Sequence, residues 1–209
     1  MSTVIIDYGV GNLFSLCCSF RAIGEEVAVS GDPEVIRAAE RIILPGVGAF
    51  ADAAEKLRAS GMDAVLRERK DAGVPIMGIC LGMQLLFEKS FEYGEHPGLG
   101  FLRGEVRPIS EVIAPELKIP HMGWNALRFS SPKHPLFKYL HPGDCVYFVH
   151  SYSARNCADS VIATAEYGAD LTAAVALGNV MGCQFHPEKS GAVGLSILRA
   201  FCEIRRGDL

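Results

Sequence analysis

The first half of the chain alternates between short apolar runs and segments whose apolar residues have helical spacing. The apolar runs predict three buried strands, at residues 4–6, 27–29 and 42–45. After the first run, apolar residues recur at the i, i+3, i+4 and i+7 positions of one helix face, as Leu13, Leu16, Cys17 and Phe20. A helix start at Asp32-Pro33 follows the second run, and a helical stretch over residues 53–57 follows the third. This alternation predicts parallel strands joined by right-handed crossovers, with helices on both faces of one sheet.

A fourth apolar run, residues 74–77, leads into the turn Gly78-Ile79-Cys80-Leu81-Gly82. We expect a buried strand that ends in this turn, with a helix over residues 83–89 directly after it. Because glycine has no Cβ, the two glycines let strand and helix crowd together in a strained turn that pushes one side chain out at the sheet edge. The side chain in that position is the thiol of Cys80.

The second half of the chain has strand patterns at hairpin spacing instead. These patterns predict four strands, at residues 146–149, 161–164, 171–175 and 180–185. Gly178-Asn179 marks a turn, a helix is expected over residues 193–205, and residues 113–142 are expected to form an irregular excursion. The sequence therefore predicts a single three-layer α/β/α domain over residues 1–209, with a mostly parallel sheet that becomes partly antiparallel in the second half.

Charge and cysteine content exclude several kinds of partner and compartment. The formal net charge is −4 and no run of Lys or Arg exceeds two residues, which argues against a nucleic-acid-binding or membrane surface. No apolar stretch reaches the roughly 20 residues of a membrane span, and the first residues resemble no signal peptide. The seven cysteines include no C-x-x-C pair and no spacing that fits a zinc site. We therefore expect a reduced, cytoplasmic protein without a metal or other cofactor.

Cys80 is the candidate nucleophile, because its surroundings favour the reactive form of a thiol. G-x-C-x-G after a strand is the nucleophile-elbow pattern, with a thiol where hydrolases of similar shape carry a hydroxyl. The N-terminus of the helix behind the sulfur adds positive potential, which favours the thiolate. We expect the chemistry of the protein to start at this residue.

A cysteine nucleophile needs a base, and the base needs a group that orients it. Phe185-His186-Pro187-Glu188 offers both at the carboxyl end of a predicted strand, where α/β sheets carry their functional loops. If Pro187 holds the chain extended, Glu188 can accept a hydrogen bond from one nitrogen of His186 and leave the other nitrogen for the thiol. Taken alone, the same residues also fit a surface turn. Beside the elbow, they predict a triad of Cys80, His186 and Glu188.

The glycine-rich segment after the third strand, residues 44–50, is the candidate oxyanion loop. Backbone N–H groups around Gly46, Val47 and Gly48 can be presented to a tetrahedral oxyanion. The elbow adds the N–H group of Leu81. One lost oxyanion donor raises a barrier by about 2.7–4 kcal/mol, so this loop would matter as much as a catalytic side chain. A phosphate loop or a plain turn is the alternative, although the segment matches neither phosphate-binding glycine pattern.

Six separated motifs make the chain similar to a known enzyme family. They are Asp7-Tyr8-Gly9-Val10-Gly11-Asn12, Pro45-Gly46-Val47-Gly48-Ala49-Phe50, Gly78-Ile79-Cys80-Leu81-Gly82-Met83-Gln84, His121-Met122-Gly123-Trp124-Asn125, Tyr147-Phe148-Val149-His150-Ser151-Tyr152 and Phe185-His186-Pro187-Glu188-Lys189-Ser190. The third and the last resemble the triad-type, class I glutamine amidotransferases. The others narrow the resemblance to the glutaminase subunits of imidazole glycerol phosphate synthase, in histidine biosynthesis. The similarity runs from about residue 4 to Phe201 and implies a flavodoxin-like α/β/α fold.

The resemblance also implies a reaction, the hydrolysis of glutamine to glutamate and ammonia by the triad. It implies substrate contacts from five residues, Gln84, Glu92, His150, Ser151 and Tyr152. Glu92 would pair with the ammonium group of glutamine, and the backbone of the last three residues would meet its carboxylate. From the residues alone, the alternative is that Gln84 is a solvated helix position and Glu92 a loop carboxylate.

The remaining motif residues are implied to face a partner, a cyclase subunit of (β/α)₈-barrel type that forms a heterodimer with this chain and receives the ammonia. The candidates for this interface and ammonia gate are Asn12, Met122, Trp124, Tyr147 and Lys189. A lone tryptophan is more commonly a core residue. Because Trp124 lies in an expected irregular segment, we place it at the ammonia exit instead.

Other functions remain open at this point. One keeps the triad but serves another amidotransferase pathway, or acts as a free-standing γ-glutamyl hydrolase that needs no partner. Another is a catalytically idle regulatory or binding subunit, against which the intact triad argues. The glycines of the candidate oxyanion loop also suggest gating, in which the partner with its substrate selects the productive loop conformer.

Overall fold

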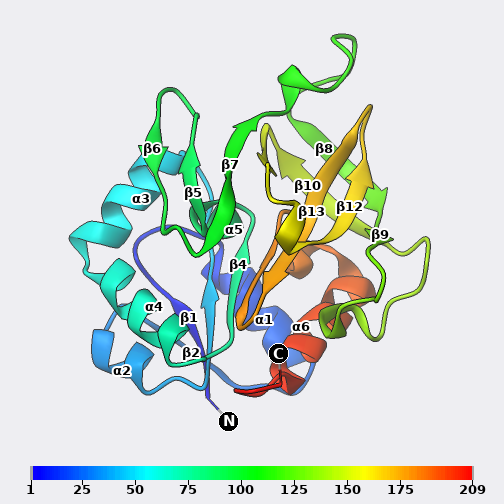
Figure 1. Cartoon of the computed structure of the whole chain (residues 1–209). Coiled ribbons are helices and arrows are strands. Elements are labelled where there is room, and N and C mark those ends of the chain that lie inside the picture. Colours follow the sequence, from blue (N-terminus) through cyan, green and yellow to red (C-terminus); the bar gives the residue numbers. More distant parts are fainter. Residues whose placement is uncertain (1, 209) are drawn as a thin grey trace.

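The computed structural model describes residues 2–208 and is organised around one eight-stranded sheet (Figure 1). In spatial order its strands are β2 (Val27–Ser30), β1 (Thr3–Ile6), β3 (Arg41–Leu44), β4 (Ile76–Ile79), β14 (Val180–Cys183), β13 (Asp170–Leu177), β12 (Val161–Glu166) and β9 (Arg128–Phe129). The first five are parallel to one another, and the last three join antiparallel. The predicted mostly parallel sheet with later antiparallel strands is confirmed.

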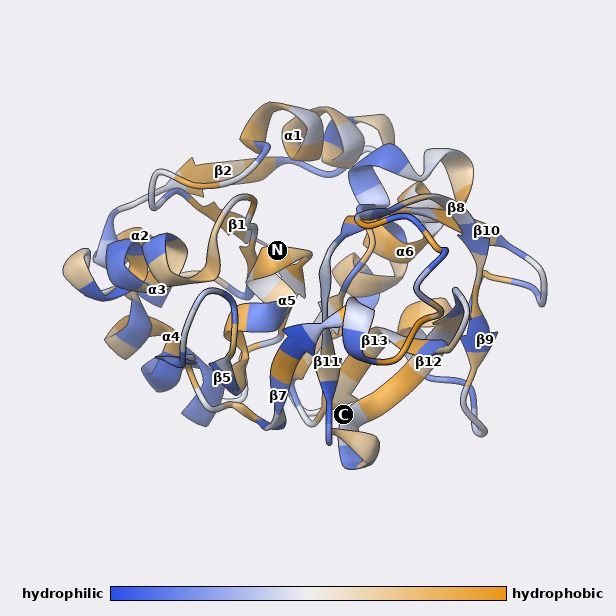
Figure 2. Ribbon diagram, turned by 90° about the horizontal axis from the view of Figure 1, so that it is seen from above, coloured by the Kyte–Doolittle hydropathy of each residue, from blue (hydrophilic) through white to orange (hydrophobic). Residues whose placement is uncertain are grey.

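Helices cover both faces of this sheet, so the predicted three-layer arrangement is also confirmed. One face carries α2 (Pro33–Arg37), α3 (Phe50–Ala59) and α4 (Met62–Asp71), and the other carries α1 (Leu13–Ala22) and α6 (Gly191–Glu203). Figure 2, seen from above, shows these two groups on opposite sides of the strands. Ile6 of β1 packs in one core cluster and its neighbour Ile5 in the other, as the alternation of a strand requires. Among residues 2–208, no helix is long and apolar enough to cross a membrane.

Two smaller sheets lie in the upper half of the view in Figure 1, and β8 and β10 are drawn there next to β12 and β13 of the large sheet. One has the order β11 (Tyr152–Arg155), β7 (Leu102–Pro108), β5 (Phe87–Ser90) and β6 (His96–Pro97), and the other pairs β10 (Cys145–His150) with β8 (His121–Ala126). Short 3₁₀ turns are η1 (Ile109–Glu111), η2 (Pro135–Phe137), η3 (Ala158–Ser160) and η4 (Pro187–Lys189). These additions bring the connections between distant strands to one end of the molecule.

The helix after the elbow is shorter than predicted. The pattern predicts a helix over residues 83–89, whereas α5 spans Leu81–Leu85 and the next residues form β5. Phe87 and Ser90 are fully buried while Glu88 between them is exposed, because β5 pairs with β7 and β6. These strand partners lie later in the chain, and the apolar run alone does not reveal them.

The segment over residues 113–142 is also more regular than predicted, because it contains β8 and β9. In β8 the inward residue His121 is polar, while Met122 and Trp124 point outward and are 60% and 56% exposed. A strand with a polar inner face and apolar outer residues reverses the usual alternation, so the pattern conceals it.

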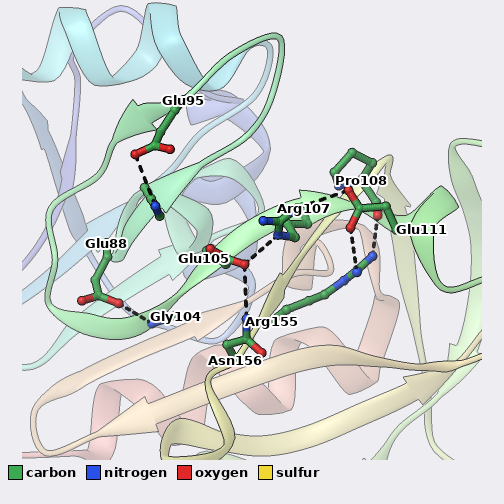
Figure 3. A network of polar contacts seen from close by, with 10 residues as sticks. Glu88, Glu95, Gly104, Glu105, Arg107, Pro108, Glu111, Arg155 and Asn156 are labelled. Carbon is green, nitrogen blue, oxygen red and sulfur yellow. Dashed lines mark hydrogen bonds and ion pairs between the residues drawn. The ribbon is translucent and has the colours of Figure 1, made fainter.

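A polar network braces the sheet that contains β7 and β11, as Figure 3 shows. Arg155 of β11 donates to Pro108 O at 2.5 Å and to Glu111 at 3.0 Å. Glu105 of β7 accepts from Arg107 at 2.6 Å and from Asn156 at 3.2 Å. Each surface ion pair contributes only about 0–1 kcal/mol, so the network mainly sets geometry. Its effect is to tie the end of β11 to the second half of β7 and to the turn η1 that follows it.

Candidate active site

The candidate nucleophile lies in the sharp turn between β4 and α5. Cys80 has φ 54° and ψ −111°, a conformation that residues other than glycine rarely adopt. An added Cβ on Gly78 would lie 2.5 Å from the carbonyl oxygen of Gly82, and one on Gly82 would lie 1.9 Å from that of Leu44. Both positions therefore require glycine, and the strained turn that the sequence predicts is present.

His186 and Glu188 form a buried pair beside this turn. Nδ1 of the imidazole lies 2.8 Å from Oε1 of the carboxylate, and the side chains are 3% and 2% exposed. Burial lowers the pKa of His186, but hydrogen bonds with Cys80 and Glu188 outweigh burial and raise the pKa to about 9. With Nδ1 committed to the carboxylate, Nε2 is left for the thiol. The structure thus brings the three predicted triad residues together.

Backbone contacts fix the segment that carries this pair. His186 N donates to Tyr147 O of β10 at 3.0 Å, and Ser190 Oγ donates to His186 O at 2.7 Å. Tyr147 N in turn donates to Ser190 Oγ at 2.9 Å. The prediction that Pro187 keeps the chain extended is wrong, because Pro187 begins the 3₁₀ turn η4. The tighter turn still brings Glu188 back to the imidazole two residues before it.

Gln184, which the sequence analysis did not single out, lies beside the candidate nucleophile. It is fully buried and donates from Nε2 to Cys80 Sγ at 3.8 Å, while its Oε1 accepts from Gln84 Nε2 at 3.0 Å. The signal in the sequence was a polar residue inside an apolar run directly before His186, since buried amides require partners. Gln184 is therefore an additional candidate for holding the thiolate.

The start of the candidate oxyanion loop packs directly against the elbow. An added Cβ on Gly46 would lie 2.6 Å from Gly82 N and 2.9 Å from Leu81 Cβ, so only glycine fits there. The buried Tyr8 hydroxyl donates to Pro45 O at 2.7 Å. The loop is therefore anchored at its first residues.

The tip of this loop is open. Val47 is 43% exposed, and Gly48 has φ 93° with nothing within 4 Å of an added Cβ. Both residues line one cavity together with Cys80 and Leu81. The N–H group of Leu81 is the first of α5, where helix N–H groups lack intrahelical acceptors and are free for a ligand. A fixed start and an open tip are compatible with gating, which stays a prediction.

A cavity of about 590 Å³ joins these elements. The predicted site residues that line it are Val47, Gly48, Cys80, Leu81, Gln84, Glu92, His150, Ser151, Tyr152, His186 and Lys189. Sequence analysis missed the lining residues Tyr93, Pro108, Ser110, Ile119, Pro120 and Val149, most of them in connections without a periodic pattern. Within residues 2–208, no group of three or more His, Cys, Asp or Glu side chains is placed to hold a metal ion.

The two side chains expected at the amino-acid end of glutamine have defined partners. Glu92 Oε2 accepts a hydrogen bond from Phe50 N, the first residue of α3, at 2.6 Å. The preceding residue, Ala49, has no side chain that could cap this helix. Gln84 is 5% exposed and also donates to Tyr152 O at 3.2 Å, so the alternative of a solvated helix position is wrong. Both side chains line the cavity, and their contacts with glutamine stay predictions.

Four of the predicted interface residues lie outside the cavity, and the fifth, Lys189, is exposed on η4 at its rim. Met122 and Trp124 project from β8, and the indole ring lies 5.9 Å from the ring of Tyr147. Asn12 caps α1, where its Oδ1 accepts from Ser15 N at 3.4 Å. Because η4 packs against both α1 and β10, this surface adjoins the triad segment.

Solved structures of low sequence identity share this fold. A crystal structure described as a glutamine amidotransferase superposes with a TM-score of 0.74 at 21% identity, covering 96% of this chain and 97% of its own. The structure of PurLQS from Thermotoga maritima gives a TM-score of 0.72 at 20% identity, covering 96% and 97% of the two chains. At these identities the likeness establishes the fold alone.

Sequence comparisons narrow the family further. The profile of the glutamine amidotransferase class-I family matches residues 4–204. Imidazole glycerol phosphate synthase subunit HisH of Lactococcus lactis subsp. lactis (strain IL1403) is 50% identical over 201 residues, which cover 96% of this chain and 97% of the relative. The subunit of the same name from Geobacillus kaustophilus (strain HTA426) is 48% identical over 206 residues, 97% of each chain. With the elbow and the buried His186–Glu188 pair in place, the chain belongs to the class-I glutamine amidotransferases, and within them to the HisH subunits of imidazole glycerol phosphate synthase.

Proposed function

We propose that this chain hydrolyses glutamine and delivers the ammonia to a cyclase subunit that makes imidazole glycerol phosphate in histidine biosynthesis. Family membership supports the reaction, and the cavity supports the assignment of residues. The observation that carries the assignment is the strained elbow, which presents Cys80 to a histidine held 2.8 Å from a buried carboxylate.

The first half-reaction forms a thioester. The Cys80 thiolate attacks the side-chain amide carbon of glutamine, and the N–H group of Leu81 with those near Gly48 receives the oxyanion. The C–N bond then breaks as the imidazolium of His186 gives its Nε2 proton to the leaving nitrogen, and ammonia departs. Glu188 keeps the ring oriented throughout.

The second half-reaction returns the enzyme to its starting state. Neutral His186 takes a proton from water, and the resulting hydroxide attacks the thioester carbonyl. The C–S bond breaks, so that glutamate is released and Cys80 leaves as the thiolate. Glutamine and water are thereby converted to glutamate and ammonia, and no step requires a metal or a redox cofactor.

The substrate is proposed to lie with its amino-acid end between α3 and the connection of β10 to β11. Glu92 would then offer a carboxylate to the ammonium group, while backbone groups of His150, Ser151 and Tyr152 meet the carboxylate of glutamine. Support comes from their shared cavity. The amide of Gln84 is already engaged with Tyr152 O, so this side chain shapes the cavity wall as well as facing the ligand.

The surface around η4 is proposed to receive the barrel cyclase. Large apolar side chains stand exposed there, with Phe14 at 79% and Met122 and Trp124 above half. Exposed apolar groups of this kind mark protein-binding surfaces. Phe14 and Glu188 line the same groove. A partner bound on this face would therefore lie close to the triad, and the path of ammonia to it would be short.

Reconstitution tests the proposal. The purified chain is assayed for glutamate release alone and with a (β/α)₈-barrel cyclase subunit, and Cys80→Ala is compared with Cys145→Ser, an exposed thiol on β10. We expect turnover that depends on the partner, is lost in Cys80→Ala and is kept in Cys145→Ser. Strong turnover without any partner would identify a free-standing hydrolase, and turnover in Cys80→Ala would exclude the triad mechanism. We propose a cytoplasmic location for this reaction, because the seven cysteines are all free and include no C-x-x-C pair.

A further inference from the structure

A chain of hydrogen bonds runs from strand β8 to the wall of the active-site cavity. It begins where Asn125 Nδ2 lies 2.8 Å from Glu166 O, and continues where His121 Nε2 lies 2.8 Å from Asn125 Oδ1. His121 Nδ1 then lies 3.0 Å from His150 Nε2, and His150 Nδ1 lies 2.8 Å from Tyr152 O. The chain therefore ends on a carbonyl group of the cavity wall.

That carbonyl group is connected to the nucleophile through two buried amides. Tyr152 O also accepts from Gln84 Nε2 at 3.2 Å, and the same nitrogen donates to Gln184 at 3.0 Å. Gln184 in turn reaches Cys80 Sγ at 3.8 Å. A displacement of the carbonyl would therefore shift the amide that contacts the sulfur.

The His121 ring is held in one plane, so its direction of donation depends on its tautomer. It is stacked on Phe148 with centroids 5.0 Å apart and on Tyr167 with centroids 4.1 Å apart. Interplanar angles of 22° and 19° show that the ring is held between two nearly parallel neighbours. The proton position on this ring, rather than its rotation, is what can change.

Counting N–H groups shows that the chain cannot satisfy all its contacts while both imidazoles are neutral. Both ends are carbonyl groups, which only accept, so each of the four contacts needs one N–H group. Whichever way its amide points, Asn125 supplies one of them, and two neutral rings supply one each. One contact must then lack a donor. Burial keeps the rings neutral near pH 7, since it lowers the pKa of His121 and lowers that of His150 to about 4.

The contact that lacks a donor is the one nearest to water. The proposed arrangement turns the Asn125 amide by 180°, so that its nitrogen donates to His121 Nε2 and its oxygen faces Glu166 O. This outer contact is exposed, so a water molecule can replace the missing donor there. The contact between His121 and His150 is buried, and an unsatisfied group at that end would cost more. His150 therefore donates from Nδ1 to Tyr152 O, and His121 donates from Nδ1 to His150.

We propose that His121 is a positioning residue for glutamine hydrolysis: as its Nδ1–H tautomer it fixes His150, which holds the Tyr152 carbonyl in place. It touches no substrate and acts through its neighbour. This inference rests on the proposed glutaminase function, since it names a further residue of that site.

Two variants of His121 separate this role from simple packing. In His121→Asn the side-chain amide takes the place of Nδ1 and still donates to His150, whereas in His121→Gln it takes the place of Nε2 and reaches only Asn125. Both variants lose the stacked ring. In the complex with the cyclase, we expect kcat/KM for glutamine to be about tenfold lower in His121→Gln than in His121→Asn, the effect of one buried donor. Equal losses in the two variants would overturn the proposal.

A measurement on the full wild-type chain keeps the test independent of turnover and of variant folding. Long-range ¹H–¹⁵N correlation spectra of ¹⁵N-histidine-labelled protein at about pH 7 report which ring nitrogen carries the proton. We expect Nδ1–H on both His121 and His150. A proton on Nε2 of His121 would overturn the proposal, whether or not the complex hydrolyses glutamine. A correct tautomer with no glutamine turnover would instead contradict the proposed function.

Discussion

Replacing Glu188 with glutamine should move the alkaline limit of glutamine hydrolysis. The carboxylate lies 2.8 Å from the imidazole of His186, and both side chains are almost fully buried, so solvent screens the pair weakly. The pKa of His186 is about 9 instead of 6.5, a rise worth about 3 kcal/mol. Hydrogen bonds with Cys80 and Glu188 together stabilise the protonated imidazole and outweigh the cost of its burial. If the substitution removes about half of this stabilisation, the pKa of His186 falls by about one pH unit.

The assay is steady-state glutamate release by the complex with the cyclase, from about pH 6 to about pH 10. In Glu188→Gln we expect the alkaline limb of kcat/KM to move from about 9 to about 8. We also expect the rate at neutral pH to fall roughly 100-fold, because the imidazole loses the carboxylate that orients it. Glu203→Gln is the matched control, since this exposed carboxylate on α6 contacts Lys138 and Tyr139 and lies outside the cavity. An alkaline limb that stays at the wild-type position in Glu188→Gln would refute the reasoning.

Stability, loop packing and the exposed surface provide the remaining predictions. Burial lowers the pKa of His150 to about 4, so the unfolded chain binds the proton more tightly and the free energy of unfolding should fall as pH drops from about 6.5 towards 4. The raised pKa of His186 has the opposite effect, because its contribution to the free energy of unfolding is complete below about pH 6.5 and is lost as pH rises through 9. Urea denaturation across both pH ranges checks the two slopes. A free energy of unfolding that does not change with pH in these ranges would contradict them. Gly46→Ala places a Cβ 2.6 Å from Gly82 N, so we expect a loss of about 1–3 kcal/mol in urea denaturation together with reduced turnover, and wild-type values would contradict the packing argument. Trp124→Ala should weaken cyclase binding by about 2 kcal/mol in titration calorimetry and leave the Tm of the free chain unchanged, because the side chain is 56% exposed; unaltered affinity would remove Trp124 from the interface.

The fold and the strained turn at the candidate nucleophile could be predicted because their signals are local. Apolar runs separated by helical spacing predict a covered parallel sheet, and that sheet is present. The two glycines around Cys80 predict a turn too tight for side chains at their positions. In the structure, the surroundings of Gly78 and Gly82 leave no room for a Cβ. The family resemblance that these motifs suggested is confirmed by sequence comparison.

The errors occurred where a residue's environment depends on strands that lie far away in sequence. Residues 87–89 belong to the helix predicted over residues 83–89, but pairing with β7 makes them part of a strand. The strand β8 was concealed because its inward residue is His121, whose partner His150 lies 29 positions later. Gln184 was overlooked because its neighbours Gln84 and Cys80 approach it only after β4 and β14 pair.

The sequence by itself determined which residues we propose to carry the chemistry, because the elbow glycines, the thiol and the His-Pro-Glu run each impose a local geometry or a local reactivity. The tertiary structure alone decided what supports that chemistry. The pairing of β14 with β4 brings His186 to Cys80, and the pairing of β8 with β10 completes a polar chain behind the cavity wall. Hydrogen bonds between groups so distant along the chain form only when folding has already paired their strands, so no local pattern encodes them.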